Sequence, residues 1–371
     1  MTTIPFIDLS LAESDPKGLA QDLRRACMDY GFFYLVGHGL SRSYLEDVVL
    51  EQSQRLFALP THVKQQLSDS VLSRGYTALR EERLDPARQV ATGDTKEGYY
   101  IGREIGCDDP QYNPAKFCGP NVWPDAVRLP KFRTTMQAYF DKLCTIGFSL
   151  TRVLAVSLNL PHDYFDAAFC QPLAVLRLLR YEAVTSCPEQ GLFGCGAHSD
   201  YGMWTLLLTD AHKGLQIQTK SGQWMDIPPR PSLPAPYDIN TTLPLVVNLG
   251  DMLERWTNGL YRSTLHRVLT TTESTRDDDN DDAVKNKDDT TASSPQLPQR
   301  HHGYKNQQRH SIPFFYEPAY DTIVSCLPTC CNDTDNPPRY PPITSGEHLL
   351  QKYKETHADF TPATTTTDAQ K

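Results

Sequence analysis

Two histidines and one aspartate are the residues of this sequence best suited to bind a metal ion. His198 and Asp200 are separated by a single residue, and His266 lies further along the chain. Two imidazoles and one carboxylate form the facial triad of non-haem iron sites, which leaves coordination positions open for other ligands. Residues i and i+2 of a strand project from the same face, so His198 and Asp200 can bind one ion together. We expect His266, on a distant strand, to be the third ligand.

A second pair of polar residues is suited to bind a carboxylate. Arg309 and Ser311 flank His310, and in a strand they would share one face while His310 points to the other. A guanidinium fork beside a hydroxyl is a good partner for a carboxylate group. Each motif alone is weak, since most His-x-Asp pairs lie at surfaces or in turns. Their ordered combination on predicted strands indicates an enzyme whose pocket holds Fe(II), O2 and a 2-oxo acid.

The second half of the chain is predicted to supply the strands that position these residues. After Pro172, short apolar runs alternate with Gly, Pro and Asn, which is typical of a sandwich or barrel. The predicted strands are residues 175–181, 197–209, 214–219, 245–249, 263–270 and 311–317. Because helical patterns dominate the first half, we predict an α+β fold in which N-terminal helices support a jelly-roll core.

The first half combines helical patterns with two short strands. Apolar residues recur at helical spacing in three segments, which are residues 17–30, 41–58 and 129–160. Residues 4–9 and 31–36 are predicted strands, and residues 68–128 are predicted to be irregular. The sequence thus places an N-terminal helical and mixed region at residues 1–170, which packs on the core.

One long segment of the core contains almost no apolar residues. Residues 273–308 include the acidic run Asp277–Asp282. Such a segment buries too little surface to offset the entropy cost of ordering it, so we predict a disordered insert between two strands. The catalytic core is then residues 171–360, interrupted by this insert, and residues 361–371 form a disordered tail.

Several motifs resemble the isopenicillin N synthase-like 2-oxoglutarate/Fe(II) dioxygenases. The motifs are HSDYG at 198–202, NLGD at 248–251, STLHR at 263–267 and RHSIPFF at 309–315. The N-terminal IPFIDL run at 4–9 is similar too, and the resemblance covers residues 4–360 apart from the acidic insert. It implies a double-stranded β-helix (jelly-roll) core. It also implies an oxidoreductase that uses Fe2+, 2-oxoglutarate and O2 to oxidise a small organic molecule, with release of succinate and CO2.

The resemblance implies a role for each site residue. Three residues would bind iron: His198, Asp200 and His266. Arg309 and Ser311 would hold the distal carboxylate of 2-oxoglutarate, and Tyr181 stands where many members carry a tyrosine that contacts this co-substrate. Leu179 stands where plant members carry an asparagine, so the inner contacts of the co-substrate differ here. No catalytic side chain is needed beyond the metal ligands.

Two other functions remain open at this point. In some members of the family the Arg-x-Ser pair holds the carboxylate of the substrate itself, as in isopenicillin N synthase, and no 2-oxoglutarate is used. The fold could also serve as a small-molecule binding protein without turnover, although the intact triad argues against this. Oxygen uptake measured with and without 2-oxoglutarate distinguishes a 2-oxoglutarate-dependent oxygenase from an oxidase of the first kind. Succinate formation distinguishes an enzyme from a binding protein without turnover. The sequence does not identify the substrate.

Five further residues are candidates for lining the substrate pocket. Tyr99 or Tyr100 could contact substrate or pack beneath the sheet. Arg177 could face the cavity or pair with a buried carboxylate. Of Met203 and Trp204, one faces the pocket if the strand continues through them, although core packing is the default interpretation.

Composition argues against two classes of partner. The 371 residues carry a formal net charge of −9, so the chain lacks the basic excess that binds nucleic acid. No apolar run reaches the roughly 18 residues of a membrane span, and the segment Met1–Asp8 lacks the features of a signal peptide. We expect a cytoplasmic monomer that acts on a small molecule, without nucleic-acid or membrane partners.

Ten cysteines are scattered along the chain, and we interpret them as reduced thiols because no export signal accompanies them. Cys326, Cys330 and Cys331 form their only cluster. A zinc site would need a second Cys or His pair at the usual spacing, which the sequence lacks. We therefore interpret this cluster as loop thiols.

Overall fold

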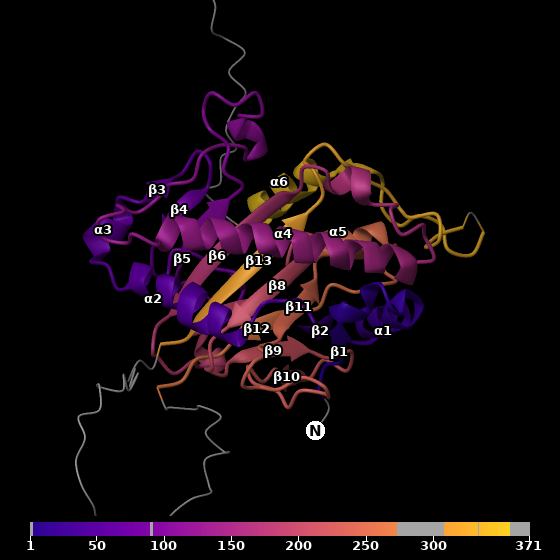
Figure 1. The fold of residues 1–371 in the computed structure, drawn as a ribbon, viewed down its shortest axis with the longest axis horizontal. Coiled ribbons are helices and arrows are strands. Elements are labelled where there is room, and N and C mark those ends of the chain that lie inside the picture. Colours follow the sequence, from indigo (N-terminus) through magenta and orange to yellow (C-terminus); the bar gives the residue numbers. More distant parts are fainter. Residues whose placement is uncertain (1–2, 90–91, 273–307, 333, 357–371) are drawn as a thin grey trace, which may run out of the picture.

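The computed structural model describes residues 3–89, 92–272, 308–332 and 334–356 (Figure 1). The predicted acidic insert, apart from Gln308, and the predicted tail lie outside the described residues. Within the described ranges, no helix combines the length and apolar character needed to cross a membrane. All ten cysteines are free thiols.

A nine-stranded sheet runs through the centre of the molecule. Its strands are β1 (Phe6–Asp8), β2 (Phe32–Val36), β3 (Ser68–Asp69), β4 (Arg74–Thr77), β5 (Lys96–Gly102), β6 (Leu173–Tyr181), β8 (Trp204–Thr209), β11 (Leu245–Leu249) and β13 (His310–Glu317). The strand order is β1-β2-β11-β8-β13-β6-β5-β4-β3. Both edges therefore come from the N-terminal half, and the C-terminal half supplies the centre.

Strands β3, β4 and β5 lie in the stretch that was predicted to be irregular, so that prediction is wrong in part. Their local pattern is weak because glycines interrupt it at Gly75, Gly98 and Gly102. The small residues are required by close neighbours, since a Cβ at Gly102 would overlap the Arg74 side chain. Pairing of β5 with the long strand β6 over its whole length stabilises the segment.

A four-stranded sheet faces one side of the large sheet. It consists of β7 (Cys195–His198), β9 (Leu215–Gln218), β10 (Trp224–Asp226) and β12 (His266–Val268), in the order β10-β9-β12-β7. Buried side chains of both sheets, among them Leu179, Tyr181, Cys195 and Ile217, form one apolar cluster between them. A separate pair, β14 (Ile323–Val324) and β15 (Ile343–Thr344), lies near the C-terminus.

The predicted strand 197–209 is two strands in different sheets. Strand β7 ends at His198, residues 199–203 form a turn, and β8 begins at Trp204. Backbone hydrogen bonds hold this turn against a helix start, because Asp251 N donates to Asp200 O (2.8 Å) and Gly250 N donates to Met203 O (3.2 Å). Met203 and Trp204 are fully buried in the main core, so core packing is confirmed for both.

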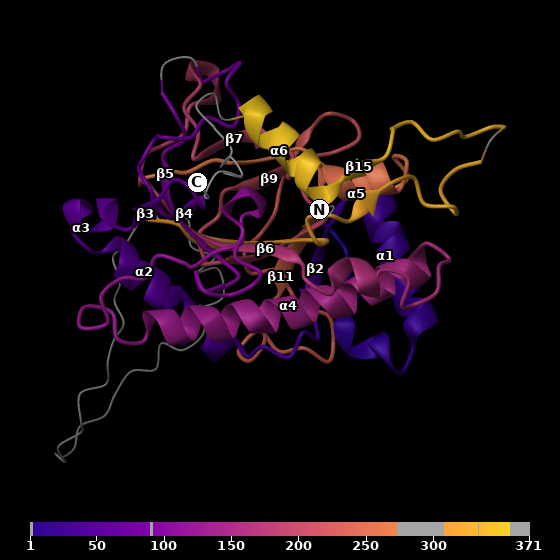
Figure 2. The same ribbon diagram turned by 90° about the horizontal axis from the view of Figure 1, so that it is seen from above.

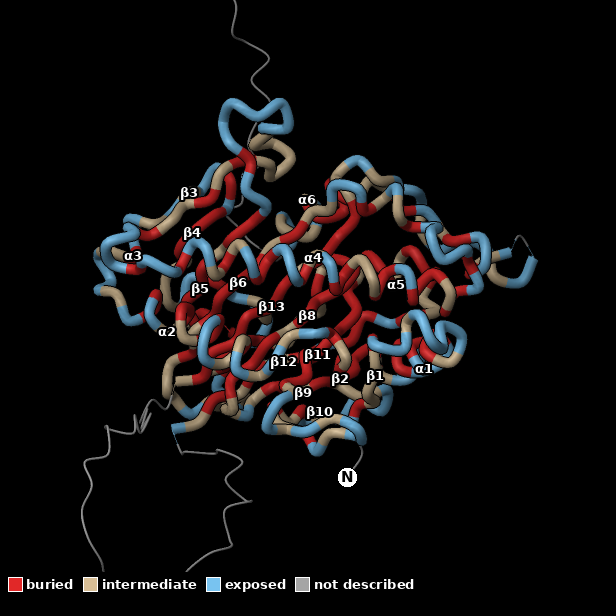
Figure 3. Tube along the Cα trace, in the orientation of Figure 1, coloured by how far each residue is buried: buried red, intermediate tan, exposed pale blue. Residues whose placement is uncertain are grey.

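Helices α1 (Pro16–Asp29), α2 (Glu51–Phe57) and α4 (Phe132–Ser157) pack together and cover the other side of the large sheet (Figure 2). The remaining described α-helices are α3 (Thr61–Gln65), α5 (Asp251–Trp256) and α6 (Ser345–Thr356). A π-helical segment, Tyr44–Leu50, runs directly into α2. Helix α4, predicted from its spacing, packs on β13 through edge-to-face contact of Phe140 with Phe314 (5.3 Å between ring centres). The central strands beneath it are buried nearly throughout (Figure 3).

Helix α6 was not predicted from the sequence, and it lies on the opposite side of the large sheet from α4. Viewed from above, α4 lies on one side of the large sheet and α6 lies on the other, on the side of β7 and β9 (Figure 2). This side also carries the candidate metal-binding residues, so a helix from the end of the chain lies over the site.

Candidate active site

The structure brings His198, Asp200 and His266 together. Pairing of β7 with β12 places the two histidines directly opposite each other, with 4.3 Å between ring centres. The Nε2 atom of each histidine is 3.7 Å from Asp200 Oδ1. All three candidate donor atoms lie within 4.8 Å of one another. Asp200 stands in the turn after β7 rather than within the strand, but its carboxylate still meets both imidazoles.

Backbone carbonyls orient both imidazole rings. His198 Nδ1 lies 2.8 Å from Gly196 O, and His266 Nδ1 lies 3.1 Å from Thr264 O. A carbonyl only accepts, so each Nδ1 carries the hydrogen and donates it. The Nε2 atom of each ring therefore faces Asp200, which is the orientation that a metal ligand requires.

The two oxygens of Asp200 have different environments. Its Oδ2 accepts hydrogen bonds from Thr205 Oγ1 (2.5 Å) and Asn248 Nδ2 (2.7 Å), which leaves Oδ1 facing the histidines. Burial opposes ionisation, but His266, His198 and these hydrogen bonds outweigh it and hold the pKa of Asp200 below its usual value. Sequence reasoning missed Thr205 and Asn248 as supporting residues. Asn248 could have been noticed as the polar residue of an otherwise apolar strand.

His266 is held in its neutral form. Burial, and then repulsion from His198, lower the pKa of His266 to about 4. A neutral imidazole at physiological pH is ready to donate its Nε2 lone pair to a metal ion.

Arg309, Ser311 and Tyr181 form a second group of site residues. The Arg309 side chain is 4% exposed, and its guanidinium carbon lies 4.8 Å from the centre of the Tyr181 ring. Ser311 Oγ lies 3.5 Å from the Tyr181 hydroxyl. Within the described residues, Arg309 Nε and Nη1 have no hydrogen-bond partner. Buried N–H groups without acceptors are costly, so this group fits a ligand that brings a carboxylate.

His310 has the orientation expected from strand alternation. Its backbone N donates to Asp210 Oδ2 (2.6 Å), and its ring lies on the helix side, 6.2 Å from the Phe57 ring centre. The His310 ring therefore projects from the opposite face of the strand to the side chains of Arg309 and Ser311.

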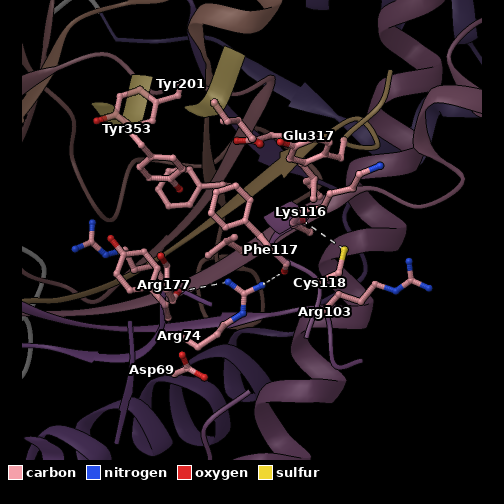
Figure 4. Close-up of a pocket in the computed structure, with 18 of the residues that line it drawn as sticks. Asp69, Arg74, Arg103, Lys116, Phe117, Cys118, Arg177, Tyr201, Glu317 and Tyr353 are labelled. Atoms are coloured by element: carbon pink, nitrogen blue, oxygen red, sulfur yellow. Dashed lines mark hydrogen bonds between the residues drawn. The ribbon is translucent and has the colours of Figure 1, made fainter. Parts of the chain in front are cut away.

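A cavity of about 1170 Å3 opens beside His198 and Asp200 (Figure 4). Its walls come from β5, β6, β13, the loop at 110–118 and α6, and they include Tyr100, Arg177 and Tyr353. Arg309, Ser311 and Tyr181 are not among its lining residues. The cavity and the Arg309 group are therefore two distinct regions, and His198 and Asp200 line the cavity.

The structure shows whether Tyr99, Tyr100 and Arg177 line the cavity or pack in the core. Tyr100 lines the cavity, whereas Tyr99 faces the core and packs edge-to-face on Phe132 (5.8 Å between ring centres). Arg177 satisfies both interpretations, because it lines the cavity and its Nη2 lies 2.5 Å from Glu82 Oε1.

Glu317, at the end of β13, is a cavity residue that sequence reasoning missed. It is 7% exposed, and burial together with the nearby Asp200 raises its pKa to about 8. Its position in the sequence could have revealed it. Glu317 is an even number of residues from Arg309 and Ser311, so all three project from the same face of the strand. An acidic residue is also unusual at a buried strand position.

Comparison with known proteins identifies two family matches. Residues 4–126 match the family described as the non-haem dioxygenase in morphine synthesis N-terminal region, and residues 174–276 match the 2OG-Fe(II) oxygenase superfamily. The chain is 34% identical over 346 residues to the 2-oxoglutarate-Fe(II) type oxidoreductase hxnY of Emericella nidulans, covering 91% of this chain and 85% of the relative. It is 31% identical over 359 residues to the kihadalactone A synthase LFS of Citrus sinensis, covering 95% and 92%.

Solved structures give a similar result. The crystal structure of a full-length Neurospora crassa protein in complex with alpha-KG has a TM-score of 0.72 and 28% sequence identity, covering 95% of this chain and 96% of that one. A putative 2OG-Fe(II) oxygenase family protein from Caulobacter crescentus has the same TM-score and identity, covering 96% and 99%. The likeness extends over nearly the whole of each chain.

Proposed function

This chain belongs to the 2OG-Fe(II) oxygenase superfamily, and we propose that His198, Asp200 and His266 bind its iron. The protein is an oxidoreductase that uses Fe(II), 2-oxoglutarate and O2 to oxidise a small organic molecule, with release of succinate and CO2. When bound, the iron couples the oxidative decarboxylation of 2-oxoglutarate to the oxidation of the substrate.

One observation carries the assignment of the iron ligands. Three donor atoms of the correct kinds converge within 4.8 Å of one another. The remaining polar atoms of these side chains are held by hydrogen bonds to Gly196, Thr264, Thr205 and Asn248. Such outer partners fix the tautomer and ring orientation of metal ligands.

We assign the distal carboxylate of 2-oxoglutarate to Arg309 and Ser311. Support comes from the two unpartnered N–H groups of the buried Arg309 guanidinium. A carboxylate accepts two parallel hydrogen bonds from such a fork. Tyr181, stacked against Arg309, would close one side of this site, and its hydroxyl would add a contact beside Ser311.

We infer further that the two facing sheets form a double-stranded β-helix (jelly-roll) core. Residues 171–360 supply the central strands of the large sheet and all four strands of the smaller one, which supports their assignment as the catalytic core. Residues 1–170 then surround this core and extend its large sheet. A cytoplasmic location and a monomeric state stay predictions.

The relatives act on or bind varied small molecules. One is named a kihadalactone A synthase, and the Neurospora crassa protein has also been crystallised with alpha-KG and thymine together. We propose that the substrate of this chain occupies the cavity beside His198 and Asp200, because two candidate ligands line this space and the Arg309 group does not.

The assignment of the ligands is tested by metal binding and turnover together. Protein reconstituted with Fe(II) should form succinate from 2-oxoglutarate in the presence of O2. The His198→Ala and Asp200→Ala variants should lose both this activity and most bound iron. Near-normal iron content in either folded variant would refute the assignment, and oxygen uptake that needs no 2-oxoglutarate would instead indicate an oxidase.

A further inference from the structure

One buried carboxyl group is left without a protein partner. Within the described part of the chain, no hydrogen bond or ion pair engages the side chain of Glu317, although it is 7% exposed. The other buried carboxylates differ, because each has at least one hydrogen bond or ion pair: Glu82, Asp94, Glu97, Asp200 and Asp210. Burial of an unpaired polar or ionised group is costly, so such groups usually have a partner.

Glu317 lies close to the candidate iron ligands. A Cβ added at Gly202, the last residue of the HSDYG motif, would overlap the Glu317 carboxyl group. Asp200 is near enough to influence Glu317 electrostatically, and both residues line the cavity with His198. A molecule that hydrogen-bonds to Glu317 would therefore be held beside the position of the iron.

The cavity around Glu317 is walled by aromatic rings from separate segments. Tyr353 of α6 lies edge-to-face on Tyr201, with 5.7 Å between ring centres, and Phe117 of the 110–118 loop lies 5.9 Å from Tyr353. Figure 4 shows Glu317 in the upper part of the pocket with Tyr201 and Tyr353, and Phe117 between them and the arginines below. Aromatic walls of this kind favour a flat, ring-shaped ligand.

The opposite side of the cavity carries a buried cation. Arg74 is 6% exposed, and within the described residues no carboxylate lies within ion-pair distance of it. Its Nη1 and Nη2 donate to the backbone carbonyls of Leu72 (3.1 Å) and Phe117 (2.8 Å), while its Nε has no partner. Arg177, on the same wall, is neutralised by Glu82. Among the described residues, the cavity thus presents a carboxyl group without a partner near the candidate iron ligands and, further away, a guanidinium without a carboxylate partner.

We propose that Glu317 determines substrate specificity by accepting a hydrogen bond from an N–H or O–H group of a flat aromatic or heterocyclic substrate. The ring of that substrate lies among Tyr201, Tyr353 and Phe117. Its opposite edge offers a hydrogen-bond acceptor, such as a carbonyl or carboxylate oxygen, to Arg74. The proposal rests on the proposed function, because it orients the substrate toward iron held by His198 and Asp200.

Matched pairs of small ring compounds test the proposal directly. Suitable pairs are uracil with 1,3-dimethyluracil, 2-pyridone with N-methyl-2-pyridone, and phenol with anisole. Binding is measured by ligand-observed NMR titration on the full chain with Fe(II) and 2-oxoglutarate, under anaerobic conditions so that no turnover occurs. At least one donor-bearing compound should bind wild-type protein about tenfold more tightly than its methylated partner, as expected for a hydrogen bond to a carboxyl group.

Variants then locate the source of this preference. Glu317→Leu should reduce the preference to less than about threefold, and Glu317→Gln, which keeps an acceptor oxygen, should retain part of it. Glu355→Gln is the matched control, because it removes a carboxylate from the exposed rim of the same cavity and should leave the preference unchanged. Thermal unfolding of the ligand-free variants checks the fold, and loss of an unpaired carboxyl group should not lower Tm.

The outcomes separate this inference from the proposed function. If the wild-type protein binds no 2-oxoglutarate with Fe(II), as followed by the visible absorption of that complex, the proposed function fails. If 2-oxoglutarate binds but no donor-bearing compound binds more tightly than its methylated partner, the role of Glu317 is refuted. A preference that persists unchanged in Glu317→Leu refutes it equally.

Discussion

The two oxygens of Asp200 illustrate how single residues prepare the site. Thr205 and Asn248 bind Oδ2, so the orientation of the carboxylate is set by β8 and β11 of the large sheet, whereas the histidines come from the smaller sheet. The site therefore depends on the packing of the two sheets as well as on the three candidate ligands. Hydrogen bonds already orient each candidate ligand, which would lower the ordering cost of metal binding.

Replacing Asn248 with Ala should weaken Fe(II) binding without removing a ligand. Loss of the 2.7 Å hydrogen bond leaves Asp200 held by Thr205 alone, and removal of such an outer partner typically lowers metal affinity roughly 10–100-fold. Competition with a chelating dye measures the change. Asn240→Ala, in an exposed loop, is the control. An Fe(II) affinity equal to that of wild-type protein would show that Asn248 does not support the ligand.

Replacing Arg309 with Ala should raise the apparent KM for 2-oxoglutarate. Removal of one partner from a buried charge pair costs about 2–5 kcal/mol, which corresponds to a tens- to thousands-fold change. Arg309→Lys should recover only part of the loss, because a point charge cannot reproduce the guanidinium fork. Fe(II) affinity, measured in parallel, should change little. An unchanged KM for 2-oxoglutarate, with a raised KM for the substrate, would favour the oxidase alternative.

At the scale of elements, strong periodic patterns were predictable and short interrupted ones were not. Helix α4 and strands β2, β6 and β11 were predicted because each has a sustained apolar pattern. The prediction was wrong for β3 to β5, whose glycines give no pattern, and these strands depend on pairing with β6. Helix α6 is short and marginal on its own, and the side chains that it buries against the rest of the protein are few: Ser345, His348 and Leu349.

For the candidate site, too, only part could be predicted from the sequence. The residue types of His198, Asp200 and His266 indicate its chemistry, because two imidazoles and one carboxylate form the facial triad of non-haem iron sites. The partners in the three-dimensional structure were not predictable. Asn248 is the single polar residue of β11, and Glu317 ends β13 after an apolar run; a polar residue in such a place can be structural or functional. Among the described residues the Asn248 side chain makes a hydrogen bond and the Glu317 side chain makes none, and only this difference separates the two cases.

The loop before β5 is attached to β6 by a buried ion pair whose effect on stability should depend on pH. Burial opposes ionisation of Glu82, but the charges of Arg177 and Lys96 outweigh it and hold the pKa of Glu82 well below its ordinary value of 4.5. The unfolded chain therefore binds a proton more readily than the folded one. This stabilisation is complete above about pH 4.5 and is lost as the pH falls toward the folded-state pKa.

Replacing Glu82 with Gln should accordingly lower the free energy of unfolding at pH 7 by about 3 kcal/mol, because Arg177 is left with an uncompensated buried charge. The difference from wild-type protein should shrink as the pH falls below about 4.5. Urea unfolding between pH 3 and pH 7 measures both effects. A difference that is constant across this range would mean that the carboxylate charge of Glu82 contributes nothing.

At the scale of the whole molecule, the cavity beside His198 and Asp200 is lined by residues from distant parts of the sequence. Tyr100 comes from β5, Arg177 from β6 and Tyr353 from α6, near the end of the described chain. The N-terminal region also supplies both edges of the large sheet. The two predicted regions, 1–170 and 171–360, thus share one sheet and one cavity, and we do not expect either to fold alone.

The acidic segment at residues 273–307 is the part of the chain that we expect to be dispensable. Its flanking residues are anchored independently, since Thr272 Oγ1 lies 3.1 Å from Thr185 Oγ1 and Arg180 donates to Gln308 (3.1 Å). The segment itself is almost free of apolar residues, so it offers little surface to bury in the core. Loop-closure cost grows only logarithmically with length, by roughly 0.6 kcal/mol for each doubling.

Replacing residues 273–307 with about ten Gly and Ser residues should therefore raise the free energy of unfolding slightly, by about 1 kcal/mol. Both KM for 2-oxoglutarate and Fe(II) affinity should match wild-type protein, because Arg309 follows the anchored Gln308. A Gly/Ser segment of the original length is the matched control, and it should abolish the gain in stability while leaving KM unchanged. If the short variant loses 2-oxoglutarate binding and the long control does not, the length of the segment is needed to place Arg309. If both variants lose it, the acidic residues themselves contribute to the site.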